Sequence, residues 1–163
     1  MCMSEMLCVS LPHQVLGTLG WDRLDAGAHA DPDAYEREGH DRKTIRLAGN
    51  QYLLATALSE ARTKTPLVCV LLHGGSIELG SLLTSCTAIV DVWFPGQQGG
   101  AGFADVLFGR STHSPAARAP QTFYASDSDL PKIGNMDLYA GNGTTYRYYK
   151  GQRPAIPFGF GLS

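Results

Sequence analysis

The sequence lacks the two features that would indicate a membrane or a nucleic acid as a partner. Its longest apolar stretch, around residues 67–72, is far shorter than the roughly 20 residues that a membrane-spanning helix needs. The formal net charge of -2 at pH 7 provides no reason to expect a polyanion to bind. We therefore expect neither a membrane nor a nucleic acid among the partners of this chain.

Several motifs of familiar enzyme chemistry are also missing. The chain has no GxSxG, P-loop or GxGxxG pattern, so nothing in it favours a serine hydrolase or a nucleotide-binding protein. Its four cysteines are Cys2, Cys8, Cys69 and Cys86. Neither their spacing nor that of His40 and its neighbouring carboxylates is typical of a metal site. We expect no metal and no cofactor, and we predict that Cys69, which lies in an apolar run, is a buried free thiol.

The sequence does not indicate the cellular compartment of the protein. The first residues, MCMSEMLCVSLP, lack the basic segment of a secretory signal and are too short for one. Asn142-Gly143-Thr144 is an N-glycosylation sequon, which matters only in a secreted protein. The localisation is therefore left unknown.

Strand-like and helix-like segments alternate along the chain. β-Branched and apolar runs predict strands, and apolar residues at helical spacing predict helices. The predicted strands are 14–21, 67–72 and 88–94, with a short last strand at 122–124. The predicted helices are 50–63, 77–83 and 99–108, and residues 22–35 form a loop.

This alternation predicts an α/β fold with a mainly parallel sheet flanked by helices. At 163 residues the chain fits one domain over residues 1–163. So few strands leave an open sheet edge, which indicates a partial α/β-sandwich. Residues 127–163 are aromatic and Gly-rich with little periodicity, and we expect them to form an irregular C-terminal tail that wraps the same domain.

Ionisable groups are concentrated in the stretch YEREGHDRKTIRLAGNQ at residues 35–51. Glu36 and Glu38 are candidates for a general acid/base, because glycoside hydrolysis needs a carboxyl group that protonates the leaving oxygen. An Asp41–Arg42 pair would then order the loop. The alternative is a solvated charged loop ahead of a helix, which is what charge runs usually are.

Two turns follow predicted strands, at the edge of the sheet where ligands bind in α/β proteins. His73 opens the first turn, and Trp93 opens the second. Both are candidates for substrate binding, since an aromatic face stacks well on a sugar. The alternative for Trp93 is that it completes the core of a strand.

Six blocks in order resemble the second, α/β-sandwich domain of glycoside hydrolase family 3, which includes β-xylosidases and β-glucosidases. They are EREGHDR with RLAGNQ, TPLVCVLLHGG, AIVDVWFPGQQGG, ADVLFG, SPAARAPQTFY and TYRYYKGQRPAIPFGFGLS. Together they cover most of the chain from about Glu36 to Ser163, and the last block is closest to the β-xylosidase and related β-glucosidase branch.

The resemblance implies a retaining β-glycosidase in which a preceding barrel domain supplies an aspartate nucleophile. The sandwich domain would supply the acid/base glutamate, with Glu38 as the first choice and Glu36 as the second. Asp41 and Arg42 would order the loop that carries it. The implied substrate is a β-linked oligosaccharide or an aryl glycoside with a terminal β-D-xylosyl or β-D-glucosyl residue.

The sequence also departs from the family pattern. Ala48 replaces the usual proline, Ala117-Arg118-Ala119-Pro120 replaces Gly-Arg-Leu-Pro, and an extra loop spans Asp22 to Ala34. The barrel domain is absent, so we expect a fragment that is inactive alone and whose partner is that barrel. The alternatives are a non-catalytic carbohydrate-binding or barrel-partner module, and a marginally folded fragment without function.

Overall fold

The computed structural model describes residues 5–10, 15–18, 41–62, 64–110 and 117–161. The chain divides into two compact units, Met1–Trp93 and Phe94–Ser163, and each is described by itself. The expectation of a single domain over 1–163 stays a prediction. Within the described ranges, no helix has the length and hydrophobicity needed to cross a membrane.

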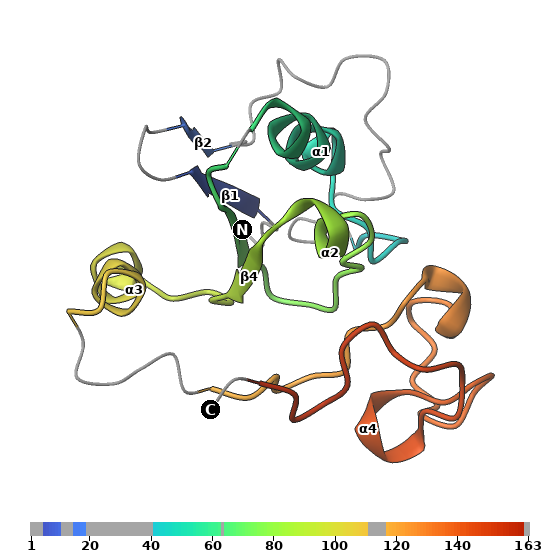
Figure 1. Cartoon of the computed structure of the whole chain (residues 1–163). Coiled ribbons are helices and arrows are strands. Elements are labelled where there is room, and N and C mark those ends of the chain that lie inside the picture. Colours follow the sequence, from blue (N-terminus) through green and yellow to red (C-terminus); the bar gives the residue numbers. More distant parts are fainter. Residues whose placement is uncertain (1–4, 11–14, 19–40, 63, 111–116, 162–163) are drawn as a thin grey trace. The chain divides into compact units, whose positions relative to one another are not determined.

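The first unit is built on a four-stranded sheet with the order β2-β1-β3-β4 (Figure 1). Its strands are β1 (Glu5–Ser10), β2 (Val15–Thr18), β3 (Leu67–Leu72) and β4 (Ala88–Asp91). β3 and β4 are parallel, whereas β1 is antiparallel to both β2 and β3. The α/β class is confirmed, but the prediction of a mainly parallel sheet is corrected to a mixed sheet.

The mixed character comes from the N-terminal residues. The connection between β1 and β2 is residues 11–14, which is long enough for a hairpin but far too short for a parallel crossover. β2 lies within the predicted strand 14–21. β1 was not predicted, and it pairs with β3 along the whole length of both strands.

β3 and β4 are joined by a crossover that contains the short helix α2 (Leu82–Ser85). A helix was predicted at 77–83, but Ile77 and Leu79 are buried in non-helical backbone instead. The predicted strand 88–94 ends early, at Asp91. It ends there because Trp93 has a φ of 51°, which is a left-handed conformation that a strand does not accommodate.

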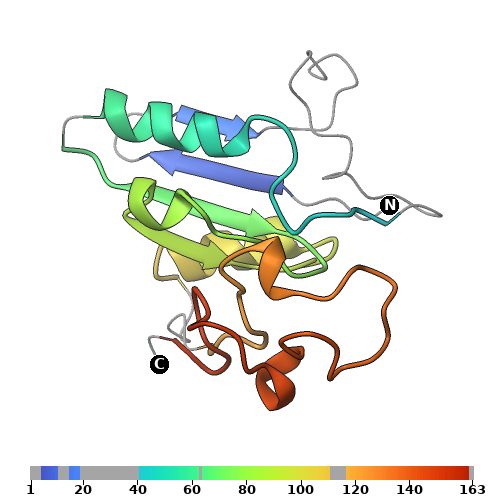
Figure 2. The same ribbon diagram turned by 90° about the vertical axis from the view of Figure 1, so that its right-hand side faces the viewer.

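Helix α1 (Gln51–Ala61) confirms the helix predicted at 50–63. It contacts β3 and α2, and α1 and α2 lie on the same face of the sheet (Figures 1 and 2). Just after the helix, the Arg62 guanidinium donates to the Thr87 hydroxyl at 2.6 Å and to the Thr65 carbonyl at 3.2 Å. These bonds join the end of α1 to the residue before β4.

The core of the first unit lies between this helical layer and the sheet. Ala55 from α1 is fully buried, as is Leu82 from α2. The largest contribution comes from β3, as expected for a strand in the middle of a sheet. Its buried side chains are Leu67, Cys69, Val70 and Leu71.

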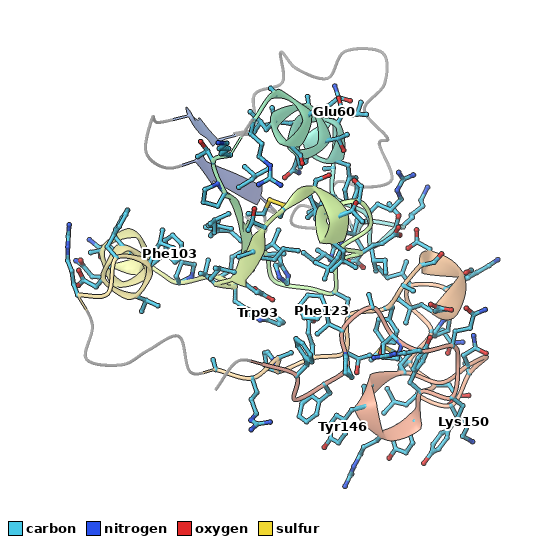
Figure 3. The ribbon with its side chains drawn as sticks, viewed as in Figure 1. Glu60, Trp93, Phe103, Phe123, Tyr146 and Lys150 are labelled. Carbon is cyan, nitrogen blue, oxygen red and sulfur yellow. A yellow bond between two sulfur atoms is a disulfide. The ribbon has the colours of Figure 1, made fainter. Side chains whose placement is uncertain are left out.

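A disulfide joins Cys69 to Cys86 (the yellow bond in Figure 3). Cys69 is buried as predicted, but the prediction of a free thiol was wrong. The two cysteines are 17 residues apart in sequence, and their Cα atoms are 5.9 Å apart. They meet because the crossover returns the chain beside β3, which cysteine spacing alone does not show.

The second unit has little regular structure. Helix α3 (Gly99–Leu107) confirms the helix predicted at 99–108. The strand predicted at 122–124 is reduced to one antiparallel bridge between Phe123 and Ile156. Beyond it lie a 3₁₀ turn, η2 (Asp127–Asp129), and the one-turn helix α4 (Thr145–Tyr148).

Aromatic contacts hold this second unit together. The rings of Tyr124 and Tyr149 meet edge to face at 5.1 Å, and those of Tyr146 and Phe158 stack at 4.2 Å. The Tyr124 hydroxyl also accepts a hydrogen bond from the Thr145 N–H at 2.7 Å. Such ring pairs add roughly 0.5–1.5 kcal/mol each beyond their buried area, which helps to order a segment without a sheet.

Removing the disulfide is expected to destabilise the first unit. A closed loop of this length stabilises a protein by about 3 kcal/mol, mainly by restricting the unfolded chain. The double variant Cys69→Ala/Cys86→Ala should therefore lose about that much free energy of unfolding in urea titrations. A reducing agent should destabilise the parent protein and leave the double variant unchanged. Equal urea midpoints for oxidised and reduced parent protein would contradict this expectation.

Candidate functional site

The candidate site lies at the carboxyl ends of the two parallel strands β3 and β4. Open α/β sheets bind their ligands at this edge. His73 follows β3, Asp91 ends β4 and Trp93 comes two residues later. Figure 3 shows Trp93 just beyond the end of β4.

Arg42 joins the sequence after the candidate glutamates to this edge. Its guanidinium is 5% exposed and donates a hydrogen bond to the Ser76 carbonyl. Gly75 leaves room for this contact, because a Cβ atom at that position would lie 2.9 Å from Arg42 Nη2. A second link is the hydrogen bond from the Glu78 N–H to the Ile45 carbonyl, at 2.7 Å. Residues 42–45 therefore run beside the turn that follows β3.

Tyr52 extends this attachment into helix α1. Its hydroxyl donates to the Glu78 carbonyl at 2.5 Å and accepts from the Leu47 N–H at 3.2 Å. One phenol thus joins the segment before α1 to the segment after β3. Of the other predicted site residues, Asp41 is exposed, whereas Glu36, Glu38 and His40 lie outside the described residues.

His73 and Asp91 connect the ends of the two parallel strands. His73 is fully buried, and its Nδ1 lies 2.6 Å from the Gly75 carbonyl. A carbonyl only accepts, so Nδ1 carries a proton in this contact. The other ring nitrogen, Nε2, is 3.0 Å from Asp91 Oδ1. Since His73 has no exposed surface, it orients its neighbours in this structure and does not present itself to solvent.

Trp93 packs on this pair. Its ring centroid lies 5.1 Å from that of His73, and its backbone N–H donates to Asp91 Oδ1 at 3.1 Å. The φ of 51° at Trp93 costs roughly 1–2 kcal/mol for a residue with a side chain. Strained backbone of this kind clusters at functional sites, where the surroundings enforce it.

Trp93 and Asp91 each have one polar atom that is buried without a hydrogen-bond partner among the described residues. They are the indole Nε1 of Trp93, a donor, and Oδ2 of Asp91, an acceptor. Buried polar atoms are hydrogen-bonded in the great majority of cases, so each exception calls for an explanation. A hydroxyl group both donates and accepts, so it matches either atom.

Tyr124 and Tyr149 of the second unit do not offer acid/base chemistry near neutral pH. Burial raises the pKa of Tyr124, although its bond with the Thr145 backbone opposes the shift. Burial also raises the pKa of Tyr149, and the nearby Asp129 carboxylate adds to the effect. Both phenols therefore stay protonated well above pH 7. No cluster of three or more His, Cys, Asp or Glu side chains that could hold a metal ion occurs in the described part of the chain.

A sequence model of the glycosyl hydrolase family 3 C-terminal domain matches residues 22–163. The chain belongs to glycoside hydrolase family 3. This confirms the resemblance on which the sequence interpretation rested, and the α/β fold agrees with it.

Proteins similar to this chain include xylosidases. It is 39% identical to a xylan 1,4-β-xylosidase of Xylanibacter ruminicola, over 77% of this chain and 14% of that protein. It is 38% identical to a probable exo-1,4-β-xylosidase of Neosartorya fischeri, over 89% of this chain and 20% of that protein. The chain therefore spans about a fifth or less of the length of the curated relatives it matches.

A solved structure agrees with these relatives. The structure is that of a family 3 exo-β-xylosidase in complex with a xylobiose aziridine activity-based probe. It superposes with a TM-score of 0.66 at 34% identity, and the match covers 78% of this chain and 17% of that one. The fold described above is thus the fold of part of a family 3 xylosidase.

Sequence reasoning missed Asp91. It was grouped with the apolar run AIVDVWF and treated as part of a strand. The available signal was a single carboxylate at the end of an otherwise apolar parallel strand, where charges are rarely placed without a partner. Its partners are the imidazole of His73 and the backbone of Trp93.

Removing the Asp91 carboxylate is expected to destabilise the first unit. Asp91→Ala removes the carboxylate that lies 3.0 Å from Nε2 of the buried His73 and that accepts the Trp93 N–H. Leaving a largely buried donor without its acceptor costs roughly 1–3 kcal/mol. Asp105→Ala is the matched control, because that aspartate is 54% exposed and lies 3.9 Å from an exposed Arg110. The control should change the free energy of unfolding by less than about 1 kcal/mol. Equal effects of the two substitutions in urea titrations would refute the role given to Asp91.

Proposed function

We propose that this chain supplies the acid/base carboxyl group of a retaining β-glycosidase. The enzyme would remove terminal β-D-xylosyl or β-D-glucosyl residues from the non-reducing ends of oligosaccharides. Family membership and the xylosidase relatives support this proposal, and they favour xylose. The observation that carries it is the anchoring of Arg42 at the turn after β3.

This anchoring bears on where the candidate glutamates lie. Glu38 precedes Arg42 by only a few residues in the sequence. Because Arg42 is attached to the turn after β3, the length of chain between them limits how far Glu38 can lie from that turn. Glu38 is therefore our first choice for the acid/base and Glu36 the second. The described segment that follows them is attached to the turn after β3, at the edge where α/β sheets bind ligands.

The proposed reaction has two steps that use the same carboxyl group. As an acid, it protonates the glycosidic oxygen while the nucleophile of the barrel domain attacks the anomeric carbon. As a base, it then takes a proton from the water that releases the sugar. A retaining pair needs its two carboxyl groups at roughly 5–5.5 Å, so the loop must hold the glutamate firmly. Asp41 and Arg42 are proposed to order the loop for this purpose.

Trp93 and Asp91 are proposed to bind the sugar itself. In this structure the indole Nε1 and Asp91 Oδ2 are buried without a hydrogen-bond partner among the described residues, so a sugar hydroxyl must displace the groups that cover them to bond with either atom. His73 is proposed to hold both in place from behind, through its contacts with the Asp91 carboxylate and the Trp93 ring. The substrate is thus a β-linked oligosaccharide or aryl glycoside, and the protein partner is the barrel domain of the same enzyme.

The acid/base assignment is tested by the leaving-group dependence of variants in the intact enzyme. Glu38→Gln should slow hydrolysis of xylobiose by about 10²- to 10⁴-fold, because its leaving group must be protonated. The kcat/KM for 2,4-dinitrophenyl β-xyloside should be far less affected, since that leaving group departs as an anion and kcat/KM reports the first step. Its kcat should fall, because the second step has lost its base. Glu36→Gln is the matched control, and the same pattern there would move the assignment to Glu36. If neither variant distinguishes the two substrates, the acid/base proposal fails.

The isolated chain is expected to have no turnover of aryl β-xylosides or β-glucosides. One carboxyl group cannot both attack the anomeric carbon and protonate the leaving oxygen. The control is the Glu36→Gln/Glu38→Gln double variant, which reveals any contaminating activity. Turnover by the parent chain that the double variant lacks would contradict the expectation.

The same preparation tests a non-catalytic carbohydrate-binding function, which the two unpaired polar atoms of the Trp93 cluster also favour. Titration with xylobiose, followed by tryptophan fluorescence, measures whether the isolated chain binds sugar. Binding that is lost in Trp93→Ala, together with an intact enzyme that does not depend on Glu36 or Glu38, would replace the acid/base proposal with this one.

A further inference from the structure

The tip of the second unit presents an asparagine in a tight turn. Asn142 is exposed, and its carbonyl accepts a hydrogen bond from the Lys150 N–H at 2.7 Å. The following Gly143 is buried with a φ of 73°, and a Cβ there would lie 2.1 Å from the Tyr148 carbonyl oxygen. The turn is therefore closed tightly on the inside, while the side chain of Asn142 lies on the outside.

Thr144 completes the Asn-x-Thr pattern, and the fold makes no use of its hydroxyl. Thr144 is the N-cap residue of α4, a position at which threonine usually accepts a hydrogen bond from the helix backbone. No such cap bond forms. Its Oγ1 is buried and has no partner among the described residues. A hydroxyl in this state costs stability, so the described structure gives no reason for threonine in preference to valine here.

The Cys69–Cys86 disulfide provides an independent observation. Disulfides form and persist in the secretory pathway and outside the cell, and they are rare in reducing compartments. The secretory pathway is also where Asn-x-Ser/Thr sequons are modified. The two features come from different units of the chain, and both indicate the same compartment.

We propose that Asn142 carries an N-linked glycan. In this step the Nδ2 atom of Asn142 forms a bond to the anomeric carbon of an oligosaccharide that a lipid diphosphate carries. The bond from that carbon to the diphosphate oxygen breaks, the lipid diphosphate leaves with the electron pair, and the amide proton passes to a base of the transferring enzyme. The Thr144 hydroxyl is buried in the folded turn, so attachment precedes the closing of the turn. The exposed position of Asn142 then leaves the glycan in solvent.

The acceptor is tested in cell-free translation with microsomes, with the full chain directed into the lumen by an added signal sequence. The parent chain and Thr144→Ser should gain mass that peptide-N-glycosidase removes, with conversion of Asn142 to aspartate detected by peptide mass spectrometry. Asn142→Gln and Thr144→Val should not gain mass. Thr144→Val retains the side-chain shape and removes only the unpaired hydroxyl, and attachment precedes folding, so misfolding does not explain a loss.

Two results would overturn the proposal. One is a parent chain that enters the lumen, as shown by signal removal, and gains no glycan. The other is protein purified from its natural source in which Cys69 and Cys86 are oxidised and Asn142 is unmodified. Asn142 in the natural protein should instead be recovered as aspartate after peptide-N-glycosidase treatment.

Discussion

The contact between the buried Arg42 guanidinium and the Ser76 carbonyl is the constraint on which the candidate site depends. A guanidinium is removed from water at a high cost unless its donors are satisfied, and its planar fork of donors suits fixed acceptors. Here the acceptor belongs to the turn after β3, next to Gly75, where a Cβ atom would lie 2.9 Å from Arg42 Nη2. The segment that follows the two candidate glutamates is thereby held at the edge of the sheet.

From this turn a series of polar contacts runs across the ends of both parallel strands. The Gly75 carbonyl contacts His73, His73 contacts Asp91, and Asp91 accepts from the backbone of Trp93. The series explains how a tryptophan is kept at a positive φ, since Asp91 holds its N–H and the buried His73 contacts its ring. It also gives a physical reason for a charge at the end of an apolar strand. The same edge of the sheet thus carries the Arg42 contact, the Trp93 ring and the Asp91 carboxylate.

The elements that the sequence predicted well are those with a strong local signal. α1 was predicted from its amphipathic period, β3 from its apolar run and α3 from its small residues. The structure contains all three with nearly the predicted bounds. β1 was missed because its strand character comes from pairing with β3. The Cys69–Cys86 bond was missed for the same reason, because it depends on how the crossover returns the chain. Local composition does not show which segments distant in sequence pair with each other.

The residues of the candidate site likewise divide into those that local sequence predicted and those that it missed. Glu36, Glu38, Asp41 and Arg42 were identified from a motif, and His73 and Trp93 from their position after predicted strands. Asp91 escaped because its importance lies in contacts with residues distant in sequence. The positive φ of Trp93 could not be predicted either, because an apolar run of residues does not indicate the backbone angle of one member. Family membership adds what neither local pattern nor this chain contains, namely the expectation of a second carboxyl group on another domain.

The central claim is that this chain is the acid/base half of a divided active site. It is tested most directly by mixing the chain with a separately produced barrel domain of its enzyme and measuring xylobiose hydrolysis as the concentration of the chain is raised. The account predicts activity that neither part has alone, that saturates with the chain, and that the Glu36→Gln/Glu38→Gln double variant does not restore. Full hydrolysis by the barrel alone, or equal restoration by the double variant, would contradict it.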